Sequence, residues 1–136
     1  MLQFEKHIMQ YLENSGVGTI AAASGWGIFE SQLPTTPNTC IVVTENGGKP
    51  ILTLGEIQGN FFQFNIIIRG NAGITGQTAA LVKANEIYDL LKFNLMITVG
   101  SDVYHNIRAI SNVMDGGQDK NNRPMFAMNF MGLYSN

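Results

Sequence analysis

The stretch Phe61–Leu91 changes its apolar period part-way along, and this change constrains the fold more than any other feature. Its first part alternates as a strand does, with one apolar face formed by Phe62, Phe64, Ile66 and Ile68. The glycine-spaced run Gly70–Gly76 then stops the strand. Beyond it, apolar residues recur at helical spacing at Ala80, Ala84, Ile87, Tyr88 and Leu91. We therefore expect a long strand followed by an amphipathic helix that packs across it.

The rest of the chain supplies a second helix and several shorter strands. Leu2–Glu13 has the periodicity of a helix, and Gly16 is suited to end it. The predicted strands are Thr19–Ala23, Ile28–Glu30, Cys40–Thr44, Leu95–Val99, Asp102–Ser111 and Met125–Leu133. The order of helix, strands, helix and strands indicates an α+β fold, in which two main helices pack on a mostly antiparallel sheet.

Three segments between or within these elements have their own predictions. Ile51–Ile57 forms either a weak strand or an arm that extends from the body. Asp115–Asn122 has the composition of a polar turn. In the strand Asp102–Ser111, strict alternation places four residues on one face: Val103, His105, Ile107 and Ala109.

The last predicted strand, Met125–Leu133, is apolar on both of its faces. Phe126, Met128 and Phe130 point one way, and the other face includes Met125 and Met131. We expect such a strand to be covered twice, once by the core of its own domain and once by a neighbour such as another subunit.

Composition favours self-association over binding to nucleic acid. The 136 residues suit one domain, residues 1–136, with only 13% charged residues against an ordinary share of ~25%. Surface polarity must therefore come largely from uncharged side chains, which cost less to desolvate than lysine or glutamate. The net charge is −2, and the lysines and arginines are scattered, which argues against a dedicated nucleic-acid binder. No apolar run is long enough to span a bilayer.

The loop Asn71–Thr78 is the most catalytic-looking feature of the sequence. In NAGITGQT, Gly76 and Thr78 occupy positions of a phosphate-binding GxxxxGK[ST] loop. Asn71 replaces the first glycine and Gln77 replaces the lysine, and a neutral amide does not supply the positive charge that reaches the phosphates. A small nucleotide-binding domain that uses Gly70–Thr78 is therefore the weaker alternative to a plain connecting loop.

No other set of residues has the spacing of an active site. His7 and His105 lack neighbours at metal-ligand spacing, so we expect no metal site. Cys40 lies in an apolar run and is expected to be a buried, unreactive thiol. No serine lies in a GxSxG motif. We accordingly predict no catalytic residues, no cofactor and no enzymatic activity.

Several local patterns, in order along nearly the whole chain, resemble the tail terminator proteins of long-tailed bacteriophages, which are also called head–tail joining or minor capsid proteins. In the first part of the chain the matching segments are Asn14–Thr19, Pro34 and Pro37, Cys40–Val43 and Gly47–Pro50. In the second part they are Phe62–Arg69, Ala79–Leu91, the turn with Gly117, Asp119 and Arg123, and Asn129 with Phe130. The chain departs from the family at Lys120, where an acidic residue often follows the aspartate.

The resemblance implies a structural role in the virion, with assembly in the host cytoplasm. It implies a homohexameric ring that caps the head-proximal end of the tail tube, stops its polymerisation and joins the tail to the head connector or stopper protein. Phage DNA would pass through this ring without sequence-specific binding, and no membrane is involved. The alternative within the same class is another tail or neck protein, either a tube subunit or a neck adaptor.

Six residues are candidates for contacts with other subunits or with the tube. Because the chain has few cations, we expect Arg69, Arg108 and Arg123 to serve in subunit or loop contacts. An ion pair between Arg123 and Asp119 within one turn is an equally good interpretation. The interface candidates are Arg69, Arg108, Asp119, Arg123, Met125 and Met131. We further expect Ile51–Asn60 and Asn71–Thr75 to become ordered only against neighbouring subunits.

Overall fold

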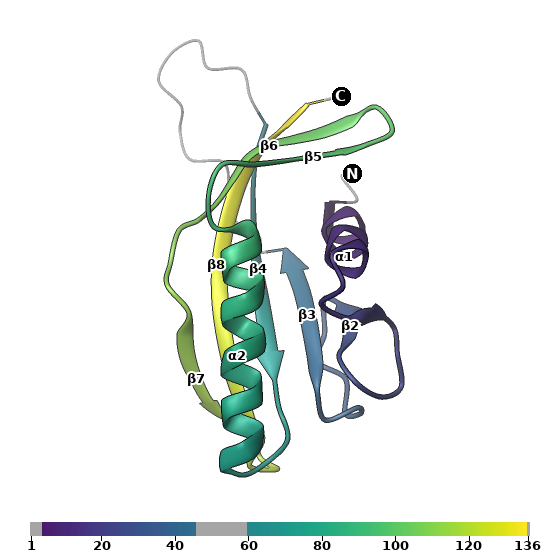
Figure 1. Ribbon diagram of the computed structural model, residues 1–136. Coiled ribbons are helices and arrows are strands. Elements are labelled where there is room, and N and C mark those ends of the chain that lie inside the picture. Colours follow the sequence, from purple (N-terminus) through teal and green to yellow (C-terminus); the bar gives the residue numbers. More distant parts are fainter. Residues whose placement is uncertain (1–3, 46–59, 136) are drawn as a thin grey trace.

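The computed structural model describes residues 4–45 and 60–135 (Figure 1). Its helices are α1 (Phe4–Asn14) and α2 (Ile74–Leu91). Its strands are β1 (Thr19–Ile20), β2 (Gly27–Glu30), β3 (Cys40–Glu45), β4 (Asn60–Arg69), β5 (Leu95–Val99), β6 (Asp102–Ala109), β7 (Met114–Gln118) and β8 (Pro124–Ser135). The predicted segment Ile51–Ile57 and the turn at Gly47–Pro50 lie outside the described residues.

The strands form one curved sheet in the order β1-β2-β3-β4-β8-β6-β5, with β7 paired to β8. The pairs β1–β2 and β2–β3 are parallel, and the other pairs are antiparallel. Both helices pack on the same face of this sheet, and their apolar residues join one core with the strand residues beneath them (Figure 1). The α+β class with two helices on a mostly antiparallel sheet is confirmed.

The period change in Phe61–Leu91 is confirmed in detail. All four predicted core residues of β4 are at most 5% exposed, and the Phe4 ring of α1 lies 5.0 Å from the Phe62 ring. Helix α2 buries Ala80, Ala84, Ile87 and Leu91 against the sheet, while Tyr88 is half-buried beside this stripe. Residues 40–43 of β3 are buried on both faces of the sheet, as their continuous apolar run predicts.

Helix α2 begins earlier than the sequence pattern indicates, because Ile74 and Thr75 already lie in its first turn. The glycines of this run allow the end of β4 and the start of α2 to pack closely against each other. A Cβ atom on Gly70 would lie 2.6 Å from the Gly76 carbonyl oxygen, and one on Gly76 would overlap the Asn71 carbonyl oxygen. These glycines are therefore required for packing, whatever else the loop does.

Two predictions on the C-terminal strands are wrong. Strand β6 contains an irregularity between His105 and Arg108, and Asn106 has a φ of 53°. A bulge interrupts alternation, so Tyr104 and Ile107 face the core together, in place of the predicted face that combined Ile107 with Val103 and His105. Part of the predicted turn Asp115–Asn122 is strand β7, whose residues are all exposed and therefore leave no apolar pattern in the sequence.

The first strand is shorter than predicted. The segment Thr19–Ala23 was expected to be extended throughout, but β1 ends at Ile20. The cause is Ala21, whose φ of 58° lies in the left-handed region, where strand geometry is impossible.

Replacing Gly76 with alanine tests the close approach between strand and helix. The added methyl group overlaps backbone that cannot move without shifting α2, so we expect Gly76→Ala to lower the free energy of unfolding by about 1–3 kcal/mol. Urea titration followed by circular dichroism measures this change. Thr78→Ala is the control, because Thr78 is exposed on the same helix, and its effect should stay within about 0.5 kcal/mol. A Gly76→Ala protein as stable as the Thr78→Ala protein would contradict the packing role.

Candidate functional site

Three of the six predicted site residues meet at one end of the sheet, in what we call the arginine cluster: Arg69, Asp119 and Arg123. Arg69 is the last residue of β4, and the other two flank the turn between β7 and β8. The Arg123 Nε atom lies 2.8 Å from Asp119 Oδ2, and the Arg69 Nη1 atom lies 3.9 Å from the same oxygen. The interpretation of Arg123 as the ion-pair partner of Asp119 within its own turn therefore agrees with the structure.

The arginine cluster holds the proline-bearing loop of residues 31–39 against the sheet. Both arginines are buried, and their guanidinium groups donate five hydrogen bonds of 2.6 to 3.1 Å to this loop. The accepting oxygens belong to Pro34, Thr35, Pro37 and Asn38. Hydrogen bonds from a charged donor are stronger than neutral ones, so these contacts fix the loop to the ends of β4 and β8.

The electrostatics of the arginine cluster depend on a single carboxylate. Partial burial acts to raise the pKa of Asp119, but hydrogen bonds from the backbone N–H groups of Arg123 and Asn121 oppose it. Together with the Arg123 guanidinium they hold the pKa of Asp119 below its ordinary value. Two guanidinium groups share this one negative charge, so the cluster carries one net positive charge.

The other three predicted residues lie on or near the face of the sheet that carries no described helix. Arg108 is half-buried, and its Nη1 atom donates to the Asn106 carbonyl oxygen at 3.2 Å. Its Nη2 atom lies 3.4 Å from the sulfur of Met131, which is buried. Met125 is half-buried and stands opposite Arg69 in the β4–β8 ladder. That any of the six residues contacts another subunit or the tube stays a prediction.

The helix-free face has a polar centre within its apolar surface. Asn65 and Asn129 are paired across β4 and β8, and their side chains share a hydrogen bond of 2.9 Å. On this face Ile67 and Ala127 on one side, and Phe61 and Leu133 further along on the other, are half-buried, while Met131 between them is buried. The second apolar face of the last strand is therefore present as predicted, while its cover by a neighbour remains a prediction.

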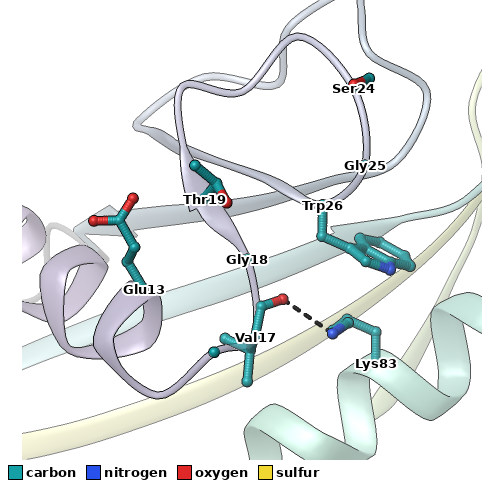
Figure 2. Close-up of a pocket in the computed structure, with 9 residues that line it drawn as sticks. Glu13, Val17, Gly18, Thr19, Ser24, Gly25, Trp26 and Lys83 are labelled. Atoms are coloured by element: carbon teal, nitrogen blue, oxygen red, sulfur yellow. Dashed lines mark hydrogen bonds between the residues drawn. The ribbon is translucent and has the colours of Figure 1, made fainter.

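A polar pocket of about 420 Å³ lies between the end of α1 and the middle of α2 (Figure 2). Figure 2 shows Glu13 on one side of it and Trp26 with Lys83 on the other. The Lys83 Nζ atom donates to the Val17 carbonyl oxygen at 2.9 Å and lies 5.6 Å from the centre of the Trp26 ring. The remaining lining residues are Gly16, Gly18, Thr19, Ser24 and Gly25.

The charged groups of this pocket already have partners. Glu13 accepts a hydrogen bond from the Ile20 N–H group, and Lys83 forms an ion pair with Glu86 at 2.9 Å. The pocket can hold a polar group between opposite charges, but it brings no nucleophile next to a base. The sequence prediction missed it, because its residues come from segments that only the fold brings together. The glycines on both sides of Val17 and Trp26 were the available signal.

A histidine and a tyrosine form a short side-chain contact between α1 and β6. The His7 Nδ1 atom lies 2.6 Å from the hydroxyl oxygen of Tyr104, which is fully buried in the core. Burial, together with the nearby Asp102 carboxylate and Tyr134, raises the pKa of Tyr104 to about 12. The phenol therefore keeps its proton at neutral pH, and its hydrogen bond with the His7 ring ties α1 to β6.

Within residues 4–45 and 60–135, histidine, cysteine and acidic side chains form no group that could hold a metal ion. Among the helices that the structure describes, none is long and apolar enough to cross a membrane. The single cysteine, Cys40, is buried, and its burial raises the pKa of the thiol despite the nearby arginines. A raised pKa lowers the reactivity of a thiol, as its apolar neighbours in the sequence predict.

Comparison with known protein families identifies the family of this chain. The family model described as bacteriophage tail terminator protein matches residues 11–132. The chain belongs to this family. The matched range includes α2, the arginine cluster, and all of the sheet up to Gly132 in β8. The resemblance drawn from the local sequence patterns is thereby confirmed.

A solved structure supports the fold of this tail terminator independently. It superposes with a TM-score of 0.56 at 14% sequence identity, and the alignment covers 98% of this chain and 91% of the other. At that identity the likeness concerns the fold alone. A search of the curated proteins found no match.

Removing one guanidinium from the arginine cluster should release the loop of residues 31–39. Arg69→Met keeps the apolar stem but removes three charged hydrogen bonds, so we expect the free energy of unfolding to fall by about 2–4 kcal/mol. Arg108→Met is the matched control, because Arg108 is half-buried and its described hydrogen bonds go to Asn106 in β6 and to Met131 rather than to the loop, and it should cost less than about 1 kcal/mol. Denaturant unfolding of both variants measures the difference. Equal losses in the two proteins would rule out a special role for the cluster.

The loop should also detach in acid, because Asp119 must be ionised to bridge the arginines. Since its pKa is lowered in the fold, its contribution to stability is fully present above its unfolded pKa of about 3.9. The contribution is lost as the pH falls through the lower pKa of the folded state. Protection of residues 31–39 against hydrogen exchange, relative to the intrinsic exchange rate at each pH from about 5 down to about 1, measures this, and Asp119→Asn should show the low protection at every pH. Exchange in the Asp119→Asn protein that stays as slow as in the unchanged protein at neutral pH would contradict the role of the carboxylate.

Proposed function

We propose that this tail terminator closes into a hexameric ring on the head-proximal end of the tail tube. The ring stops the addition of tube subunits and presents its opposite surface to the head connector or stopper protein. The observation that carries the proposal is the family match over residues 11–132, which includes nearly every described element. In this proposal the chain acts as one domain of residues 1–136, within the virion, after assembly in the host cytoplasm.

The composition of the chain supports a structural role at a DNA passage. A net charge of −2 without a basic stripe is compatible with DNA that passes through the ring, because clustered cations would bind the phosphates and retain the polyanion. Uncharged polar surface and exposed apolar residues favour contacts between copies. The proposed mechanism is steric and requires no catalysis, cofactor or metal.

The glycine loop carries no support for the nucleotide alternative. Gly70 and Gly76 are explained by the close contact of β4 with α2. The next lysine along the chain, Lys83, lies in the third turn of α2 and binds the Val17 carbonyl oxygen. A tube subunit or neck adaptor remains the alternative structural role, and it differs from a terminator in how far it assembles.

Capping of purified tail tubes is the direct test. We expect the protein, added to tube subunits during polymerisation, to shorten the tubes in proportion to its concentration, because a capped end cannot accept further subunits. Electron microscopy with a gold-labelled protein should show the label at one end of each tube only. Light scattering of the protein alone should show monomers or closed rings of fixed mass. Label along the whole tube, or open-ended tubes formed by this chain alone, would instead identify a tube subunit.

A further inference from the structure

Helix α2 exposes apolar residues on the side that faces away from the sheet. Ile74 is 83% exposed, Val82 is 62% exposed and Leu81 is 40% exposed, and we call these three residues the helix patch. Their spacing places them on one side of the helix, and in Figure 1 no described element lies in front of α2. An amphipathic surface helix ordinarily carries polar side chains there. No charged residue occurs from Gly70 to Val82, so this side of α2 is suited to burial.

A second apolar feature lies just beyond the other end of the same helix. Phe93, in the turn between α2 and β5, is 82% exposed, and Met96 in β5 is 63% exposed. We call these two residues the turn patch. The chain turns directly after Phe93, because Asn94 adopts a left-handed φ of 48°. Residues from Phe93 to Ser101 are all uncharged, so the two patches are separated along the chain only by the charged last turns of α2.

The two patches cannot cover each other within one molecule. A helix rises about 1.5 Å per residue, so Val82 and Phe93 are roughly 16 Å apart along α2. In a second copy of the chain, the turn patch can cover the helix patch of the first copy. Two different patches that bind each other give a head-to-tail contact, which generates a ring when the rotation between copies closes. Self-pairing of one patch would stop at a dimer and leave the other patch exposed.

We propose that the turn patch of one copy binds the helix patch of the next copy, with Phe93 as the aromatic anchor against Val82 and Leu81. This inference rests on the ring proposed above and names the surfaces that close it. The side chains of both patches carry no charge themselves, and a buried aromatic is a common centre of binding energy at interfaces. Thr78 and Asn85 are exposed among the residues of the helix patch and add uncharged polar groups to it.

Mixing two variants tests the head-to-tail contact. Val82→Asp damages only the helix patch, and Phe93→Asp damages only the turn patch, so we expect each variant alone to lose ring formation. In an equimolar mixture the intact Phe93 of the first variant can bind the intact helix patch of the second. The mixture should therefore form a one-to-one heterodimer and no larger species, as measured by native mass spectrometry. Gln10→Asp adds the same charge at an exposed position on α1 and should leave assembly unchanged.

Disulfide cross-linking between introduced cysteines detects the same contact even if free copies associate weakly. The chain's own Cys40 is buried, so Val82→Cys combined with Phe93→Cys provides the only exposed thiols among the described residues. A mild oxidant should convert this protein into a ladder of covalent oligomers. Gln10→Cys combined with Val82→Cys is the control and should give only the cross-linking expected from random collisions. Circular dichroism of all variants verifies that the exposed substitutions leave the fold intact.

The outcomes separate this inference from the proposed function. Rings that persist in both aspartate variants, or a cysteine pair that cross-links no better than its control, would overturn the inference and leave the ring intact. Where the unchanged protein forms rings, aspartate variants that fail to assemble alone and also fail to form the heterodimer would show that the two patches do not face each other. Successful trapping by a protein that does not cap tail tubes would overturn the proposed function and leave the contact between copies standing.

Discussion

Strands β4 and β8 pair without interruption from Asn60 opposite Tyr134 to Arg69 opposite Met125, and the other elements are arranged around this ladder. One face of the two strands carries the aromatic and aliphatic residues that both helices cover, with the rings of Phe64 and Phe130 stacked 5.2 Å apart. Strand β8 also pairs along its other edge with β6 and β7. A break in this ladder would therefore separate the sheet into two parts and divide the surface on which both helices pack.

The ends of the same ladder organise the irregular parts of the chain. Arg69 closes β4 and Arg123 precedes β8, so the register of the two strands brings both guanidinium groups to one place. There they meet a single carboxylate and the carbonyl oxygens of the proline-bearing loop. The bonded residues of this loop lie 31 to 35 residues from Arg69 along the chain, and Thr35 lies 88 residues from Arg123. No residue of the loop 31–39 is buried, so the loop is held to the sheet by charged hydrogen bonds instead of by apolar packing. This is a structural use of residues that sequence reasoning had associated with contacts between subunits.

The surface of the molecule shows why a chain of this composition suits a tail terminator. With few charges, the protein exposes apolar residues on α2 and in the following turn, and it leaves one face of its sheet half-buried without a described helix. Exposed apolar surface of this kind is uncommon on monomeric proteins and is typical of sites that bind another protein. The family match gives the class of function, and contacts between copies stay a proposal that these surfaces support.

The sequence by itself determined the class of fold, the central strand, both helices and the core faces of β4 and α2, because side-chain direction follows directly from helix and strand geometry. It also determined the family, through the order of weak local patterns along the chain. Only the tertiary structure decided the reversal of faces in β6, since a bulge at Asn106 leaves no mark in an apolar pattern. The same holds for β7, which is held by pairing with β8 rather than by its own residues, and for the contacts of Arg123 with Thr35, which lies 88 residues away. Local geometry can be predicted from local sequence, whereas contacts between distant segments depend on the register of the whole sheet.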